Sequence, residues 1–327
     1  MQQSFFDYAM QSKGGKKTDA FLAKMKQNIP FDEIEKKLIE VGIYKPNEGE
    51  RGRPSIKARI LIGALFLQSW YGLSDPMTEE LIHDRISFWK FLDILEEDDI
   101  PDETTICKFR NALIREGLLE WIFEVVKKEM EAKRLIVNKG TIVDATIIHA
   151  SEPKKRQDKE SGRKTNVAYD SEARYTSKRG RKYYGYKYHI ATDTNGVIKK
   201  LKVTPANEHD SNEFEYLTAE EKRAIFADSG YMGKERKRKL RKAGIWCGII
   251  ERRVRGQKSL RKKQVKNNRR IAAIRGLVEY PFAIIKRVMK FTEIRYRGLY
   301  KNSQHAFLIA AAYNLYRMKS LIVHHVV

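Results

Sequence analysis

Apolar residues recur at helical spacing along the first part of the chain. Their recurrence every three or four positions predicts an amphipathic helix over residues 56–72, at Ile56, Ile60, Ala64, Leu67 and Tyr71. Asp102 follows Pro101 and is expected to be the N-cap of a helix that ends near Arg115. A further predicted helix has its apolar stripe at Leu119, Ile122, Val126 and Met130. Residues 1–135 are therefore predicted to form an all-helical N-terminal domain.

The pattern changes to that of strands after residue 135. The run TIVDATIIHA is β-branched and almost wholly apolar, which predicts a strand buried on both faces of a sheet. Two further predicted strands flank residues 193–196, where Asp193 is expected to form the turn and the Asn195-Gly196 step is a strong hairpin signal. A helix near residues 212–218, a fourth strand in RAIFADSGY, a helix over residues 234–243 and a fifth strand in WCGII follow.

This order of elements predicts an α/β fold. Three strands, then helix and strand in alternation, then a terminal helix describe a mixed five-stranded sheet flanked by helices. A ribonuclease H-like domain has this order, and we predict one over residues 136–327. The Lys/Arg-rich stretch at residues 251–270 is poor in apolar residues and is expected to be a loop-like basic insertion.

The positive charge of the chain lies in two tracts of the second half. The formal net charge is +23; residues 154–187 hold 12 Lys/Arg against 4 Asp/Glu, and residues 234–270 hold 17 against 2, which together account for the whole excess. Such density favours a nucleic acid as the partner over a merely solvated surface. The residues expected to contact DNA within the second tract are Arg252, Arg253, Arg255, Lys262 and Lys263.

Several other classes of protein are disfavoured. The two cysteines, Cys107 and Cys247, have neither disulfide nor zinc-site spacing, which fits a reducing cytosol. We expect no secreted or membrane-spanning segment. The RGRP sequence at residues 51–54 resembles a minor-groove AT-hook, and a polar loop before a helix explains it equally well.

Two aspartates occupy positions where packing alone does not explain an acid. Asp144 lies within an otherwise apolar strand, where an unpaired carboxylate costs several kcal/mol of desolvation. Asp228 follows the strand of RAIFADSGY, and ligands bind at the carboxyl ends of strands in open α/β sheets. Two such aspartates on adjacent strands are suited to share Mg²⁺ or Mn²⁺, which favour oxygen ligands.

Glu279 is the third candidate acid. It lies on a predicted core-facing helix with an apolar stripe at Ile274, Val278, Phe282, Ile285 and Met289. Arg275 and Lys286, at offsets of four and seven from Glu279, are expected on the same face, a combination suited to hold metal and phosphate together. Pro281 is expected to kink this helix.

The chain resembles the bacterial DDE transposases of the insertion-sequence-five type, within the superfamily of insertion sequences four and five. The matching stretches are QSWYGLSD at 68–75, IPDETTICKFRN at 100–111, GTIVDATII at 140–148, ANEHD at 206–210, ADSGYMG at 227–233 and RGLVEYPFAIIKR at 275–287. By this resemblance Asp144, Asp228 and Glu279 match the metal-binding catalytic triad. Arg275 and Lys286 match the Arg and Lys of the Y-R-E-K signature, whereas Ala272 stands where its Tyr is expected.

The resemblance implies a transposase that binds terminal inverted repeats of double-stranded DNA and catalyses strand cleavage and strand transfer. It implies two Mg²⁺ or Mn²⁺ ions held by the triad, in-line attack on phosphodiesters, and phosphate binding by Arg275 and Lys286. A homodimer is expected because two DNA ends must meet, and the cytoplasm, at the nucleoid, is the expected location. The helical domain is expected to bind DNA ends or dimerise, with Arg110 and Asn111 reading the groove.

Alternatives remain open at this stage. A DNA-binding regulator derived from a transposase, without catalysis, would share the charge but not need the triad. A related nuclease that cuts without joining strands would share both. His209 and Asp210 of ANEHD are interpreted as caps of a strand-to-helix turn, with assistance to the metal site as the alternative.

Overall fold

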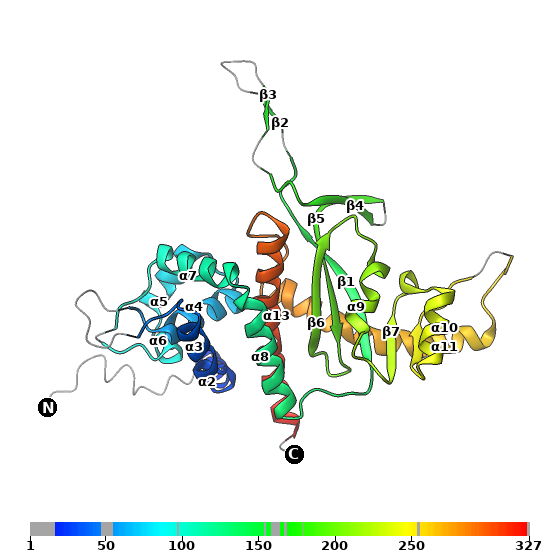
Figure 1. The fold of residues 1–327 in the computed structure, drawn as a ribbon, viewed down its shortest axis with the longest axis horizontal. Coiled ribbons are helices and arrows are strands. Elements are labelled where there is room, and N and C mark those ends of the chain that lie inside the picture. The colour runs from blue at the N-terminus through cyan, green and yellow to red at the C-terminus, as the bar shows by residue number, and fades with distance from the viewer. Residues whose placement is uncertain are drawn as a thin grey trace. The chain divides into compact units, whose positions relative to one another are not determined.

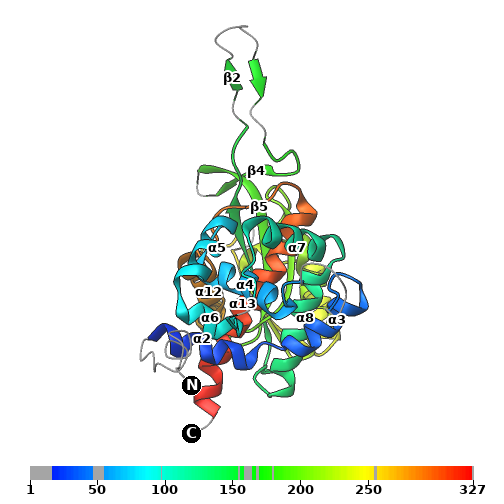
Figure 2. The same cartoon turned by 90° about the vertical axis from the view of Figure 1, so that its left-hand side faces the viewer.

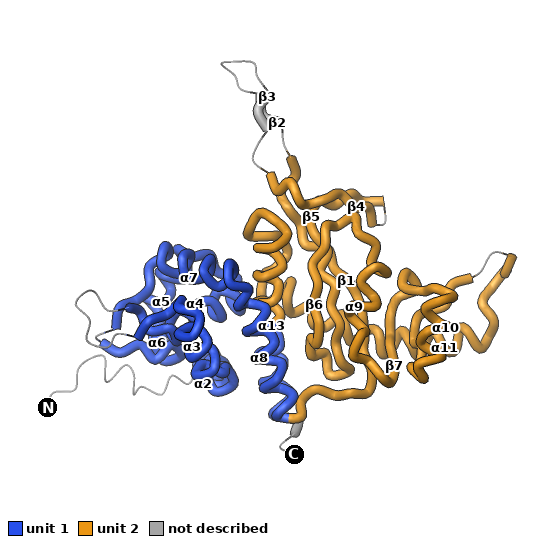
Figure 3. The backbone as a smooth tube through the Cα atoms, in the orientation of Figure 1, with its two compact units in different colours: residues 1–133, 311–327 blue, residues 134–310 orange. Residues whose placement is uncertain are grey.

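The computed structural model describes residues 17–46, 55–96, 98–153, 155–157, 164–166, 169–178, 180–253 and 256–325 (Figure 1). The chain divides into two compact units, coloured separately in Figure 3. Unit 1 comprises residues 1–133 and 311–327, and unit 2 comprises residues 134–310. Among the described residues no helix is both long and apolar enough to cross a membrane.

Among the described residues of unit 1, all regular secondary structure is helical. Its helices are α2 (Lys17–Asn28), α3 (Phe31–Glu40), α4 (Ala58–Tyr71), α5 (Asp75–Asp84), α6 (Ile86–Leu92), α7 (Glu103–Arg115) and α8 (Leu118–Ala132). The predicted cap is confirmed, because Asp102 accepts a hydrogen bond from the Thr105 backbone N–H at 2.6 Å. The apolar stripe predicted for α8 is likewise buried.

Helix α4 is more deeply buried than its sequence pattern indicated. We expected an amphipathic helix, but every residue from Ile60 to Trp70 is buried. A helix that is apolar all round lies in the centre of a helical unit rather than on its surface. In Figure 2 the other helices of unit 1 surround α4.

The C-terminal residues 311–327 pack with the N-terminal helices, whereas the sequence analysis placed them in the second domain. Helix α13 (Leu299–His325) begins in unit 2 and ends in unit 1. The Trp70 indole N–H donates to the Ala312 carbonyl oxygen at 2.9 Å, and the centroids of the Phe21 and Tyr316 rings lie 5.9 Å apart. Apolar contacts between segments distant in sequence therefore decide where the unit ends.

Arg110 of α7 is a structural residue of unit 1. Its guanidinium forms a bidentate ion pair with Asp75, with Nη1–Oδ1 and Nη2–Oδ2 distances of 2.5 and 2.7 Å. Gln68 Nε2 donates to the same carboxylate at 2.6 Å, and Arg110 is only 4% exposed. The expectation that Arg110 reads DNA bases is therefore wrong, because its side chain is buried and its donors face the Asp75 carboxylate.

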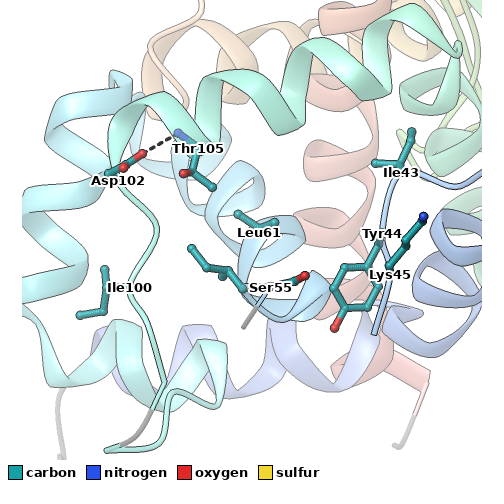
Figure 4. A pocket seen from close by; sticks show the side chains of 9 residues that line it. Ile43, Tyr44, Lys45, Ser55, Leu61, Ile100, Asp102 and Thr105 are labelled. Atoms are coloured by element: carbon teal, nitrogen blue, oxygen red, sulfur yellow. Dashed lines mark hydrogen bonds between the residues drawn. The ribbon is translucent and has the colours of Figure 1, made fainter. Parts of the chain in front are cut away.

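A cavity of about 340 Å³ lies beside the N-terminus of α7 (Figure 4). Figure 4 shows the Asp102–Thr105 cap at its rim, with Tyr44, Leu61 and Ile100 among the other lining side chains. None of the residues that line it belongs to the candidate site predicted from sequence.

Unit 2 is built on a mixed sheet of six strands. These are β1 (Thr141–His149), β4 (Arg174–Lys178), β5 (Arg181–Thr192), β6 (Ile198–Pro205), β7 (Ala224–Ala227) and β8 (Trp246–Ile249), in the order β4-β5-β1-β7-β8 with β6 also paired to β5. β1 is antiparallel to β5 and parallel to β7. Strands β2 (Lys155–Gln157) and β3 (Lys164–Asn166) form a separate two-stranded ribbon.

The predicted count of five strands is wrong by one, because β4 was not expected. Its sequence RYTSK has no alternating apolar pattern, and four of its five residues are exposed. It is an edge strand held by backbone pairing with β5, from Arg174↔Gly185 to Lys178↔Arg181. Backbone pairing of this kind leaves no hydrophobic signal in the sequence.

Helices cover both faces of the sheet. The remaining elements of unit 2 are η1 (Asp210–Glu213), α9 (Phe214–Thr218), η2 (Ser229–Tyr231), α10 (Lys234–Lys242), α11 (Lys262–Arg275), η3 (Gly276–Val278), α12 (Glu279–Ala283) and the π-helical turn η4 (Ile284–Val288). α9 and α10 pack their apolar residues against a core cluster that includes Val143 and Ala227. Because successive strand residues point to opposite faces, Asp144 faces away from that cluster.

The expected loop over residues 251–270 is wrong for its second half, because α11 begins at Lys262. Ile271 is the only residue of this helix that is buried, so the apolar pattern was too weak to predict it. Its start is instead fixed by Gln264, whose side chain accepts from the Arg261 backbone N–H at 2.9 Å.

The β5–β6 turn depends on Asp193, as predicted. The buried carboxylate accepts from the backbone N–H groups of Val197, Val137 and Asn195 at 2.8, 2.8 and 2.9 Å. Gly196 has a φ of 77°, the left-handed conformation that the Asn-Gly signal predicts. Asp193 therefore ties the hairpin to the segment that precedes β1.

His189 of β5 is expected to make the stability of unit 2 pH-dependent. The ring is 0% exposed, its Nε2 lies 2.8 Å from Thr204 Oγ1, and burial lowers its pKa from 6.5 to about 4. The unfolded chain takes up this proton first, so stability falls as the pH drops from 6.5 to about 4, by up to about 1.4 kcal/mol per pH unit.

The measurement is urea unfolding of unit 2 at pH 7 and pH 5, followed by a unit-specific probe. His189→Gln should lose less stability between these two pH values than the wild type, because its side chain has no proton to take up. Equal losses in the two proteins would show that other groups cause the acid sensitivity.

Candidate active site

Asp144 and Asp228 lie side by side at one end of the sheet. β1 and β7 are parallel and pair Val143 with Ala227, so that Asp144 is the next residue on β1 and Asp228 directly follows β7. β7 ends at Ala227, which places both aspartates where its carboxyl end opens the sheet. Their carboxylates are close enough that the charge of Asp228 raises the pKa of Asp144. The predicted adjacency of the two acids is therefore present in the fold.

The Asp144 carboxylate is held by two donors. Its Oδ1 accepts from the Ala145 backbone N–H at 2.8 Å, and its Oδ2 pairs with Arg275 Nη1 at 3.1 Å. Burial nevertheless raises its pKa above the usual range, and these two donors only partly offset that effect. A carboxylate that is costly to ionise gains from a further cation at the same place.

Asp228 is oriented by its own turn. Its side chain caps η2, and its Oδ1 accepts from the Ser229 hydroxyl at 2.9 Å. The Ser229 hydroxyl accepts in turn from Arg252 Nε at 2.7 Å. Arg252 was predicted to contact DNA, and here it reaches the acidic site through Ser229.

The helix predicted around Glu279 is interrupted twice. α11 ends at Arg275, η3 follows as a 3₁₀ turn, and Glu279 begins the short α12 before the π-helical turn η4. Pro281 therefore lies in a segment of mixed helical types rather than at one kink. Of the predicted stripe, Val278, Ile285 and Met289 are buried, and Ile274 and Phe282 are partly buried.

The two cations around Glu279 reach toward β1. Arg275 pairs with Asp144, and Lys286 Nζ donates to the Ile147 carbonyl oxygen at 2.9 Å. Glu279 itself is exposed. Within the part of the chain that the structure describes, no three Asp, Glu, His or Cys side chains gather closely enough to hold a metal ion. The structure thus brings Asp144, Asp228 and Arg275 together, but it does not close a three-carboxylate cluster with Glu279.

The two aspartates alone fit a divalent cation. They offer oxygen ligands from adjacent parallel strands, and the buried position of Asp144 disfavours its charge without a cation. Arg275 currently supplies that positive charge.

Tyr231 is a neighbour of the site that the sequence analysis did not select. Its ring packs against Phe214 with centroids 6.0 Å apart, and its hydroxyl is buried without a hydrogen-bond partner in the described structure. Burial, followed by the charges of Asp210, Asp144 and Asp228, raises its pKa. The signal was available, because Ser229 and Tyr231 both lie in the ADSGYMG stretch.

The basic residues predicted to bind DNA differ in their surroundings. Arg253 Nη1 donates to the Lys258 carbonyl oxygen at 3.2 Å, and Lys262 and Lys263 are exposed at the start of α11. Cations at a helix N-terminus are disfavoured by the helix dipole, so their presence there suits an anionic partner. Arg255 and the RGRP sequence at residues 51–54 lie outside the described residues.

His209 and Asp210 occupy the strand-to-helix turn. His209 is the N-cap of η1 and accepts from the Ser211 backbone N–H at 3.3 Å. Asp210 pairs with Lys187 Nζ at 2.9 Å. The interpretation of His209 as a cap agrees with this geometry.

Comparison with known proteins identifies two family models and one solved structure. Residues 137–315 match the model described as transposase DDE domain, and residues 11–112 match the model described as transposase domain (DUF772). The chain is also similar to a cryo-EM structure of the piggyBac transposase synaptic complex with hairpin DNA, at 10% sequence identity and a TM-score of 0.45. That match covers 92% of this chain and 74% of the other.

Proposed function

We propose that this chain, which belongs to the family of the transposase DDE domain, is a DNA transposase of the insertion-sequence-five type. In this proposal it binds terminal inverted repeats and catalyses strand cleavage and strand transfer. The observation that carries the proposal is the pair Asp144 and Asp228, next to each other at the open end of the sheet. We propose a ribonuclease H-like fold for unit 2. The proposal places the protein in a bacterial cytoplasm, at the nucleoid.

Asp144, Asp228 and Glu279 are the residues that would hold Mg²⁺ or Mn²⁺, with two ions proposed. Such ions, when bound, lower the pKa of water and stabilise the charge that develops on a phosphoryl group under in-line attack. Glu279, exposed at the start of α12, would supply the third carboxylate by closing toward the two aspartates.

The chain's own cations would hold the DNA strand in place. Arg275 and Lys286 reach the β1 edge next to Asp144 and are suited to bind the phosphates beside the scissile bond. Arg252, Arg253, Lys262 and Lys263 extend the positive surface from Asp228 to the start of α11. Phosphate contacts of this kind supply affinity and register rather than sequence recognition.

Unit 1 is proposed to bind the ends of the element or to form the dimer in which two ends meet. Arg110 takes no part in base reading, because it is committed to Asp75. Recognition of the terminal repeats must then use other residues of the helical unit.

The function is tested by incubating the purified protein with Mg²⁺ or Mn²⁺, a duplex that carries the end of its element, and a supercoiled target plasmid. We expect metal-dependent cleavage at the repeat boundary and covalent joining of the new 3′ end to the plasmid. Cleavage without joining would identify a nuclease instead, and specific binding without either reaction would identify a regulator.

A further inference from the structure

Cations reach β1 at Asp144 and just beyond it. Arg275 Nη1 pairs with Asp144 Oδ2 at 3.1 Å, and Lys286 Nζ donates to the carbonyl oxygen of Ile147, three residues further along the same strand. Burial, followed by the charge of Lys178, the last residue of β4, lowers the pKa of Lys286. Two ammonium groups close enough to repel each other form a site that an anion stabilises.

A cavity of about 170 Å³ opens beside this group of charges. It is lined by residues 145–147 of β1, by Thr176, Ser177 and Lys178 of β4, by Lys187 and by Asp210. Within the lining, Asp210 forms an ion pair with Lys187 at 2.9 Å. The lining offers no second carboxylate to pair with Lys178. Thr146, Thr176 and Ser177 of the lining carry hydroxyl groups, which can donate hydrogen bonds.

We propose that Lys178 and Lys286 together bind one phosphate of the DNA strand next to Asp144, with the hydroxyls that line the cavity as further donors. The inference rests on the proposed function, which supplies DNA as the source of the phosphate. A phosphodiester carries one negative charge on two free oxygens, which two ammonium groups can share. β4, the strand that the hydrophobic pattern did not reveal, thereby contributes a substrate-binding residue.

The test is the salt dependence of duplex binding, measured by fluorescence anisotropy without Mg²⁺ or Mn²⁺ on a labelled duplex from the end of the element. Each phosphate contact by a cation contributes about one to the slope of log affinity against log salt concentration. Lys178→Gln should lower that slope by about one, and Lys178→Arg should retain it. Lys222→Gln is the matched control, because Lys222 is also exposed but precedes the amino end of β7.

A double-mutant cycle tests whether both lysines bind the same phosphate. Lys178→Gln combined with Lys286→Gln should lose less affinity than the two single variants together, because the second removal acts on a contact that is already broken. Lys178→Met keeps the aliphatic stem and replaces Lys178→Gln if the latter does not fold.

Three outcomes overturn the inference. Unchanged slope and affinity in Lys178→Gln, with tight binding by the wild type, would remove Lys178 from the DNA contacts and leave the proposed function intact. Strictly additive losses would assign the two lysines to different phosphates. Failure of the wild type to bind any duplex would overturn the proposed function and this inference with it.

Discussion

Asp144→Asn and Asp228→Asn are each expected to lower the rate of DNA strand cleavage by about a thousandfold or more, because each removes a charged oxygen ligand worth roughly 4 kcal/mol of transition-state stabilisation. Asparagine keeps the shape of the side chain and removes only its charge. In Asp144→Asn, Arg275 also loses the carboxylate with which it pairs at 3.1 Å. Single-turnover cleavage of an element-end duplex in Mn²⁺ measures the effect.

Glu220→Gln is the matched control for these two variants. Glu220 is an exposed acid of unit 2 that forms a surface ion pair with Lys200. Its removal should leave the cleavage rate within a factor of two or so, since exposed ion pairs contribute about 0–1 kcal/mol. Binding of Mn²⁺, measured by calorimetry, should weaken in the two aspartate variants and not in the control. Full cleavage activity in Asp144→Asn and Asp228→Asn would refute the assignment of these acids.

Glu279→Gln gives the same experiment a third arm. If Glu279 closes toward the two aspartates when DNA binds, Glu279→Gln should lose as much cleavage activity as the two aspartate variants. Its Mn²⁺ affinity without DNA should change less than theirs. Comparable loss of Mn²⁺ affinity in the absence of DNA would show that the three acids already act together in the free protein.

Arg110→Met is expected to destabilise unit 1 by about 3 kcal/mol, because it leaves the partly buried Asp75 carboxylate without its bidentate partner. The bidentate geometry and the additional bond from Gln68 show that this acid is held inside the unit. Asn111→Ala is the control, since Asn111 is exposed on the same helix and should change stability by no more than about 0.5 kcal/mol.

Thermal or urea unfolding monitored by circular dichroism measures the difference. The double variant Arg110→Met/Asp75→Leu should recover much of the loss, because it removes both charges rather than one. An unfolding midpoint for Arg110→Met equal to that of the wild type would show that the ion pair contributes nothing to stability.

The predicted elements agree with the structure where local pattern carries the information. Asp102, Asp193 and the Asn195-Gly196 step act through groups within a few residues, and each occupies the predicted cap or turn. β1 was predictable because a strand buried on both faces must be apolar. β4 and α11 were not, because an exposed edge strand and a polar helix bury too few side chains to mark their own sequence.

The candidate site divides in the same way. The sequence alone determined that Asp144 lies within an apolar strand and that Asp228 follows one, since an acid in or directly after such a run stands out without knowledge of its neighbours. Only the tertiary structure decided that the two are adjacent, because the β1–β7 register pairs residues that are 84 positions apart in the chain, such as Val143 and Ala227. It also decided that Arg110 is buried against Asp75, that Arg275 pairs with Asp144, and that Lys178 lines the same cavity as Ile147, whose carbonyl oxygen accepts from Lys286. Charge interactions depend on distance in space, and that distance has no counterpart in the spacing of residues along the chain.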